Sequence, residues 1–414
     1  MILALAGVGL LALAAVLVAA GRDSNPASVG TQERSAEALV DSIGVNVHFS
    51  YVDTAYGRQA KVLSRLHELG VGHIRDGIPT SVQAQQAGLR AARRQGIQAT
   101  LISDPHGDPR AEVAASLAVM GDGIAAFEGP NELDGSGDPA WPATLRDFMP
   151  ALESAVREQA PDVPMIGPSF IHPASRMDLP AELPGSVNEH PYPDGGAPEP
   201  ALGDALRALR QHVLERGVVV TETGYHNALA GTTGQPPVSE TAAAIYLPRA
   251  LVASFGAGVR RTFIYELLDE KPDPGFVDPE QHFGLLRDDL SPKPAFTAVQ
   301  TLIAALRASP GESSRGRFSW GLQVHGEGEV QRLALVRNDG SRLIALWRPL
   351  SVWDQETRQP VEPSPLPVEL RFGLGARDVA VWRPSVATQP VLRRRYARRL
   401  PLALGGDLVL VSFR

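Results

Sequence analysis

The stretch IAAFEGPNE, residues 124–132, joins the pattern of a buried strand to an unusual polar end. Its apolar run, Ile124 to Phe127, leads into Gly129-Pro130, a pair that marks a turn, and proline cannot donate to a strand ladder. An amide and a carboxylate, Asn131 and Glu132, follow the break directly. The stretch therefore predicts a strand that ends by presenting two adjacent polar side chains.

Seven further β-type runs surround this stretch, separated by amphipathic segments in which apolar residues recur every three or four positions, as from Leu145 to Val156. This alternation, from about residue 42 to residue 308, is typical of a parallel α/β sheet. Eight units suit a (β/α)8 TIM barrel of about 250 residues. Two irregularities are expected, a fifth connection that is rich in proline and a kink at Pro248 in the seventh helix. The other expected strands cover residues 43–49, 71–76, 97–103, 164–169, 186–191, 217–222 and 261–266.

After Pro310 the apolar period changes from that of helices to two, with turn signals such as Asn338-Asp339-Gly340. This change predicts a smaller all-β domain, which we interpret as a β-sandwich. The expected organisation is an N-terminal segment at 1–20, a linker at 21–38 whose residues 21–34 form a disordered tether or a lead-in strand, the barrel at 39–310 and the β-sandwich at 316–414.

Residues 2–20 form an uncharged apolar run, long enough for a secretory signal or a membrane-spanning helix. Val18-Ala19-Ala20 fits the small-residue rule for signal cleavage, although no Lys or Arg precedes the run. We expect an exported protein that is extracellular, periplasmic or anchored in the cell envelope through residues 2–20. The chain has no cysteine, which excludes disulfides, a lipoprotein anchor, zinc-thiolate sites and cysteine nucleophiles.

The net charge of −7 is unevenly distributed, because residues 311–414 carry 16 arginines and 10 acidic residues. The larger N-terminal part is therefore acidic, which argues against nucleic acid as a partner. Five arginines cluster at Arg393-Arg394-Arg395 and Arg398-Arg399. They are interpreted as a solvated face or as a contact to anionic lipid or envelope polymer.

Polar residues stand where most of the expected barrel strands end, which is the edge that carries the active site in this architecture. A carboxylate in this position also has a simpler interpretation, since a glutamate near a helix start often serves only the helix dipole. Likewise Arg75 suits an ion pair with Asp76, and His48 a structural role. The strand-end residues are His48, Arg75, Asp76, Asp104, His106, Asn131, Glu132, Glu189, His190, Tyr192, Glu222, Tyr265 and Glu266.

Two glutamates at one barrel mouth suit glycoside hydrolysis, in which one carboxyl protonates the leaving oxygen and the other attacks or stabilises the anomeric centre. Arg75 would hold Glu222 ionised, whereas Glu132, without such a partner, would stay protonated. Asn131 would bind the sugar 2-hydroxyl. His190 or Tyr192 would orient the second carboxylate.

The motifs Gly129-Pro130-Asn131-Glu132, His190-Pro191-Tyr192 and Thr221-Glu222-Thr223-Gly224 give the chain a resemblance to the clan A retaining glycoside hydrolases. The branch around family 39 is the most similar, and the passage from Phe283 to Phe296 also looks like the approach to its last helix. The resemblance implies that Glu132 is the acid/base and Glu222 the nucleophile. It also implies a carbohydrate substrate and a trailing β-sandwich.

The sequence departs from the clan at strand eight, where many members have a tryptophan that forms the floor of the sugar site and this chain has Tyr265-Glu266. This departure leaves the floor of the sugar site open, and we expect a more polar contact, with Tyr265 as a substrate-binding residue and Glu266 binding sugar hydroxyls. Aromatic residues make up only 6% of the chain, which favours a pocket or short cleft over a long groove lined with rings.

Two other functions stay open, a non-catalytic glycan-binding scaffold of the envelope and a metal-dependent barrel hydrolase. No His-Glu-x-x-His or Walker A motif is present. The stretch Gly121-x-Gly123-x-x-Ala126 precedes its strand, so it does not fit a dinucleotide fingerprint. We therefore expect no metal and no cofactor, while the sugar, the linkage and the oligomeric state are left open.

Overall fold

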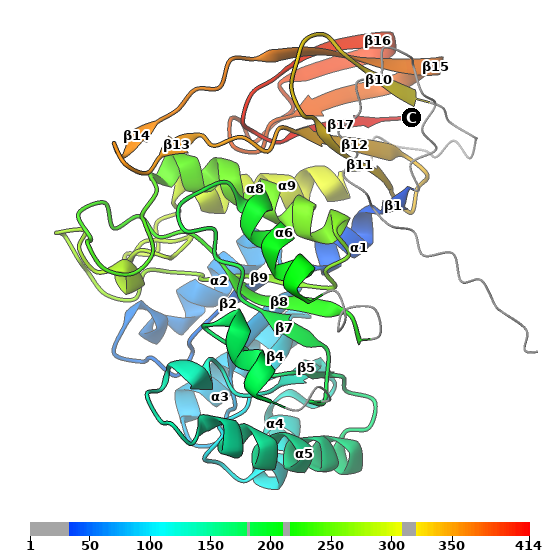
Figure 1. Ribbon diagram of the computed structural model, residues 1–414. Coiled ribbons are helices and arrows are strands. Elements are labelled where there is room, and N and C mark those ends of the chain that lie inside the picture. The colour runs from blue at the N-terminus through cyan, green and yellow to red at the C-terminus, as the bar shows by residue number, and fades with distance from the viewer. Residues whose placement is uncertain (1–32, 180–182, 210–215, 309–319) are drawn as a thin grey trace, which may run out of the picture.

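The computed structural model describes residues 33–179, 183–209, 216–308 and 320–414 (Figure 1). The apolar run at 2–20 and residues 311–315, between the expected barrel and the expected β-sandwich, lie outside these residues. None of the described helices is long and apolar enough to cross a membrane.

Eight parallel strands form the barrel, in the order β6-β5-β4-β3-β2-β9-β8-β7. Backbone hydrogen bonds join Ser186, next to β7, to Met165 and Gly167 beside β6, so the sheet closes on itself. Every expected strand is present and the (β/α)8 prediction is confirmed. The strands are β2 (Ile43–Asn46), β3 (His73–Gly77), β4 (Gln98–Ile102), β5 (Ile124–Glu128), β6 (Met165–Ile166), β7 (Val187–Glu189), β8 (Val218–Thr223) and β9 (Thr262–Ile264).

Helices cover the outside of the barrel (Figure 1). The fifth connection holds only a short 3-10 helix, Pro173–Asp178, in agreement with its proline-rich sequence. Pro248 lies inside α8, which continues on both sides of it. The helices are α1 (Ala36–Asp41), α2 (Gln59–Leu69), α3 (Gln83–Arg94), α4 (Pro109–Met120), α5 (Trp141–Gln159), α6 (Pro198–Ala208), α8 (Glu240–Gly256) and α9 (Pro294–Arg307).

The barrel interior changes from apolar to charged along the strand direction. Phe263 is fully buried in a cluster with Ala126, Ile166 and Val219. A Cβ at Gly44 would come within 2.3 Å of this phenylalanine ring, so β2 needs glycine at that position. Beyond this layer the strands end in charged side chains, and these build the site described below.

The C-terminal domain is one folded sheet in the order β1-β11-β12-β17-β15-β10, with β16 paired to β15. The long β15 pairs with β10 near its start and with β17 near its end, and its register shifts between Arg371 and Ala376. Apolar side chains such as Leu370 and Phe413 fill the enclosed core. The strands are β1 (Arg34–Ser35), β10 (Trp320–Val324), β11 (Gln331–Val336), β12 (Arg342–Trp347), β15 (Leu366–Trp382), β16 (Leu392–Leu404) and β17 (Val409–Phe413), beside a small ladder of β13 (Trp353–Asp354) and β14 (Gln359–Pro360).

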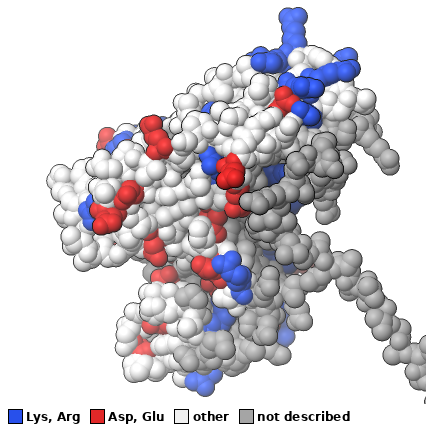
Figure 2. Space-filling view, turned by 45° about the horizontal axis from the view of Figure 1, so that its top comes forward, with Lys and Arg blue, Asp and Glu red and all other residues white. Residues whose placement is uncertain are grey.

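Arg34 and Ser35 pair in parallel with β11, in agreement with a lead-in strand, whereas residue 36 already begins α1 inside the expected linker. Residues 34–35 therefore form an edge strand of the C-terminal sheet, and the chain enters the barrel after them. The five arginines of the β16 cluster are exposed, and Figure 2 shows Lys and Arg side chains gathered on the outer side of this domain.

Buried polar contacts attach the C-terminal domain to the barrel over α8 and α9 (Figure 1). Arg249 of α8 is fully buried, pairs with Glu199 of α6, and donates to the carbonyls of Leu350 and Gly406. Arg337, on the other domain, donates to two carbonyls in the last turn of α9. Because these guanidinium groups have fixed donor geometry, they hold the two domains in one orientation.

Replacing Arg249 with methionine should lower the free energy of unfolding by about 3–5 kcal/mol, because Glu199 is left as an uncompensated, largely buried charge. Urea denaturation followed by circular dichroism measures the change. The matched control is Arg207→Met on the neighbouring α6, whose ion pair with Asp204 is exposed and contributes about 1 kcal/mol or less. Equal losses for the two variants would contradict the anchoring role of Arg249.

Candidate active site

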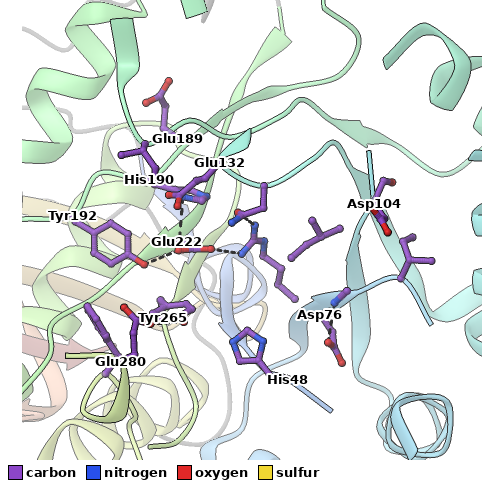
Figure 3. Close-up of a pocket in the computed structure, with 18 of the residues that line it drawn as sticks. His48, Asp76, Asp104, Glu132, Glu189, His190, Tyr192, Glu222, Tyr265 and Glu280 are labelled. Carbon is purple, nitrogen blue, oxygen red and sulfur yellow. Dashed lines mark hydrogen bonds and ion pairs between the residues drawn. The ribbon is translucent and has the colours of Figure 1, made fainter. Parts of the chain in front are cut away.

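A pocket of about 1190 Å3 opens at the carboxyl ends of the barrel strands (Figure 3). Residues at or just beyond all eight strand ends line it, which follows from the parallel arrangement of the strands. Among them are His48, Arg75, Asp104, Asn131, Glu132, Ile171, His190, Tyr192, Glu222 and Tyr265.

Arg75 of β3 lies at the centre of the polar network and is almost completely buried. Its guanidinium makes two bonds of 2.8 Å to Glu128, one of 2.6 Å to Glu222, one of 2.7 Å to Asn131 and one of 2.9 Å to Asn46. Burial would lower the pKa of Arg75, but the charges of Glu128 and Glu222 raise it above its ordinary value. Arg75 is therefore a fixed positive charge.

Glu128 was missed by the sequence analysis, which interpreted residues 124–129 only as an apolar strand. It is fully buried and also accepts hydrogen bonds from Asn188 Nδ2 at 2.9 Å and Thr221 Oγ1 at 3.1 Å. A charged residue inside a buried strand is itself a signal, since it requires a buried partner. The partner is Arg75, on a strand two positions away in the sheet.

The carboxylate of Glu222, on β8, contacts three groups that stabilise its negative charge. Arg75 and the Tyr192 hydroxyl each donate to it at 2.6 Å, and His190 Nδ1 lies 3.7 Å away (Figure 3). Burial would raise the pKa of Glu222, but the charges of His190 and Arg75 outweigh that effect, and the net pKa is lowered. The expected pairing of Arg75 with Glu222 is thus present.

Asp76 does not pair with Arg75, because neighbouring residues on a strand point to opposite sides. Its carboxyl accepts instead from the backbone of Phe49 and Gly77 and from Gln85. Burial raises the pKa of Asp76 to about 7.

Glu132 follows β5 in a left-handed backbone conformation with φ of 47°. Its backbone N–H donates to Ser169 Oγ, and that hydroxyl donates to Asn131 Oδ1. Its carboxylate is a quarter exposed and lies 2.6 Å from His190 Nδ1. Among the described residues Glu132 has no arginine partner, as expected, but the loop after β7 places His190 against it.

His190 connects the two glutamates and is itself buried. Its other ring nitrogen lies 2.8 Å from Thr221 Oγ1. Burial would lower the pKa of His190, but the charge of Glu222 and the hydrogen bond with Glu132 raise it above its ordinary value. A carboxylate oxygen of Glu132, one of Glu222 and a nitrogen of His190 all lie within 4.8 Å of one another.

The two residues at the end of β9 are placed differently. Tyr265 lines the pocket and donates to Glu280 at 3.1 Å. Glu266 is fully buried outside the lining, with Tyr56 at 3.3 Å and His48 at 3.4 Å, and burial raises its pKa well above its ordinary value. This position does not support the expected contact of Glu266 with sugar hydroxyls.

The remaining strand-end residues divide between the pocket and its surroundings. His48 lines the pocket, and its ring stacks on Tyr51 at 4.7 Å, a contact that the sequence analysis did not foresee. Burial lowers the pKa of His48 to about 4, so the ring is neutral at pH 7. Asp104 lines the pocket, whereas His106 is absent from the described lining.

Two described groups have donor atoms spaced as metal ligands, Glu132 with His190 and Glu222, and His48 with Glu266 and Glu270. In the first group Glu222 already accepts from Arg75 and Tyr192, and both nitrogens of His190 have partners. A metal ion there would have to displace these contacts. The first group therefore fits proton transfer better than metal binding.

No protein-family model and no curated protein sequence matches the chain. Solved structures match it over most of its length. They include a family 39 glycoside hydrolase from Bacteroides cellulosilyticus, with 15% identity, a TM-score of 0.64 and coverage of 92% of this chain and 82% of that one. A monomeric β-xylosidase from Caulobacter crescentus has 14% identity and a TM-score of 0.59, with coverage of 90% of this chain and 96% of that one. The GH39 enzyme from Xanthomonas axonopodis pv. citri has 15% identity and a TM-score of 0.58, with coverage of 93% of this chain and 95% of that one.

The fold is that of the family 39 glycoside hydrolases. The resemblance inferred from the motifs is confirmed at this level, for the barrel and for the C-terminal β-domain together.

Replacing Tyr192 with phenylalanine should raise the pKa of Glu222, because it removes a hydrogen bond that stabilises the ionised carboxylate. Carbon-13 NMR titration of labelled glutamate side chains measures the shift, with Glu222→Gln assigning the signal. Tyr225→Phe is the control, since that hydroxyl donates to the carbonyl of Gly196. A pKa that falls or stays constant in Tyr192→Phe would rule out this role of the tyrosine.

Proposed function

We propose that the protein is a retaining glycoside hydrolase that cleaves O-glycosidic bonds of an oligo- or polysaccharide through Glu132 and Glu222. The observation that carries the proposal is the pair of glutamates across one pocket, with Arg75 and Tyr192 bonded only to the second. This difference in surroundings separates the roles of the two carboxyl groups.

The distance between the glutamates supports retention of configuration. An oxygen of Glu132 lies within 4.8 Å of an oxygen of Glu222. Retaining enzymes have their carboxyl groups about 5–5.5 Å apart, whereas inverting enzymes need about 6.5–9.5 Å to admit a water molecule. The short separation favours direct attack by one carboxylate on the sugar.

In the first step of this mechanism, protonated Glu132 gives its proton to the glycosidic oxygen while Glu222 attacks the anomeric carbon. The C–O bond breaks, the leaving group departs as an alcohol, and a glycosyl ester forms on Glu222. In the second step ionised Glu132 takes a proton from water, whose oxygen attacks the anomeric carbon and releases Glu222. The second displacement restores the original configuration.

The residues around the pair have supporting roles in this proposal. Asn131 receives hydrogen bonds from Arg75 and Ser169 on its carbonyl oxygen, which turns its NH2 group toward other acceptors such as the sugar 2-hydroxyl. Tyr265 takes the place of the strand-eight tryptophan at the side of the pocket.

The structural neighbours support the same class of reaction, since they include family 39 glycoside hydrolases and a β-xylosidase. We further propose that the protein is exported and that residues 2–20 act as its signal or as its anchor in the envelope.

Glu222→Gln should abolish turnover, because the amide cannot form the glycosyl ester. Glu132→Gln should lower kcat/KM, which reports the first step, by about 10²–10⁴-fold on glycosides with poor leaving groups and much less on dinitrophenyl glycosides, whose leaving group needs no proton. A 2-fluoro glycoside should label Glu222, as peptide mapping by mass spectrometry would show.

Glu158→Gln, at an exposed ion pair on α5, is the control and should retain activity. Label on another residue would refute the assignment of the nucleophile. Full activity in Glu222→Gln, or inversion in the NMR spectrum of the first product, would refute the mechanism.

A further inference from the structure

The pocket has a strongly acidic wall. Nine carboxyl side chains and one guanidinium line its described part, and no lysine is among these residues. The balance of charge is a property of the pocket that the two-glutamate mechanism does not require. It bears on which sugars the pocket accepts.

The one lining arginine has no donor left for a substrate. A guanidinium carries five N–H donors. Arg75 makes five hydrogen bonds within the protein, one from Nε, two from Nη1 and two from Nη2. A substrate carboxylate could bind Arg75 only by displacing Glu222, Glu128 or an amide.

The two lining histidines do not supply a free cation either. His48 is neutral at pH 7, because burial lowers its pKa to about 4. His190 uses one ring nitrogen for Glu132 and the other for Thr221. Among the described residues of the pocket, then, none offers an unengaged positive charge.

Five lining carboxyl groups, those of Asp76, Asp104, Glu112, Asp194 and Glu280, have no ion pair with another described residue. Glu280 lies beside Tyr265, which donates to it at 3.1 Å (Figure 3). Burial raises the pKa of Glu280, and the charges of Glu222 and Glu132 raise it further. Glu280 lines the same pocket as Glu132 and Glu222, so its carboxyl can face a substrate that is bound there.

We propose that this pocket selects neutral or amino sugars and rejects sugars that carry a carboxylate or sulfate. An anionic substituent would approach several carboxyl groups, and no described residue of the pocket offers a free cation to balance its charge. Like-charge contacts of this kind lower both affinity and association rate. The proposal rests on the proposed glycosidase function and specifies its substrate class.

The test compares neutral sugars with uronic acids that differ from them only in the group on C5, and adds glucosaminide, which differs from glucoside by its amine on C2. Both anomers of 4-nitrophenyl xyloside, glucoside, glucosaminide and galactoside are assayed against the matching glucuronide and galacturonide. Polysaccharides with uronic acids are assayed before and after reduction of their carboxylates to alcohols. For the sugar that the enzyme hydrolyses, kcat/KM should be at least about 100-fold higher on the neutral or amino glycoside than on the corresponding uronide. Each like-charge contact with the pocket disfavours the anionic substrate.

Glu280→Gln should lower the ratio of kcat/KM on the neutral glycoside to kcat/KM on the uronide by about 10-fold. The amide keeps an acceptor for Tyr265 and removes a negative charge beside the sugar. Glu362→Gln, an exposed carboxylate of the C-terminal domain, is the matched control and should leave the ratio unchanged. Higher salt should narrow the ratio in the wild-type protein, since it screens the repulsion.

A uronide cleaved as well as or better than its neutral counterpart would overturn this inference and leave the glycosidase function intact. A ratio that neither Glu280→Gln nor salt changes would show that charge does not cause the selection. If no glycoside is hydrolysed and no 2-fluoro glycoside labels the protein, the proposed function fails as well.

Discussion

The site depends on one buried cation, the guanidinium of Arg75, held between two carboxylates. Arg75 lies on β3, and its five hydrogen bonds connect this strand to residues at the ends of β2, β5 and β8. Burying a guanidinium and two carboxylates is unfavourable unless every donor and acceptor is matched, and here all five donors are. Glu128 holds the arginine in a bidentate pair, which leaves one edge of the guanidinium to face Glu222. The position of the proposed nucleophile is therefore fixed by an arginine whose five donors are all engaged within the protein.

Charge balance explains why a histidine stands between the two glutamates. In the proposed mechanism the negative charge begins on Glu222 and moves to Glu132 once the sugar is bonded. His190 Nδ1 lies 2.6 Å from Glu132 and 3.7 Å from Glu222, and its raised pKa favours the imidazolium. The charge of Arg75 balances that of Glu128. The imidazolium of His190 then balances whichever of the two proposed catalytic glutamates is ionised. The interior keeps the same net charge through both steps, which limits the reorganisation that each step requires.

The fold and the position of the proposed catalytic pair at the barrel mouth could be predicted because their signals are local. Each strand shows as an apolar run, and Glu132 and Glu222 stand at the ends of two of them. Contacts between distant segments could not be predicted in this way. Glu128 looks like part of an apolar run until its partner on β3 is known, and the bond from His190 to Glu132 depends on a loop path. Glu266 was misplaced because adjacent residues at a strand end point in opposite directions, so Tyr265 takes the pocket and Glu266 the interior.

The division between barrel and rim also accounts for a shared fold at about 15% identity. The interior must satisfy fixed constraints, such as glycine at position 44 against the Phe263 ring and a partner for every buried charge. The rim has no such constraint, because its loops are solvated and can change length and charge without loss of the core. Asp104, Asp194 and Glu280 all lie on these loops. Substrate selection by charge can therefore change while the arginine-centred network and the reaction it supports stay the same.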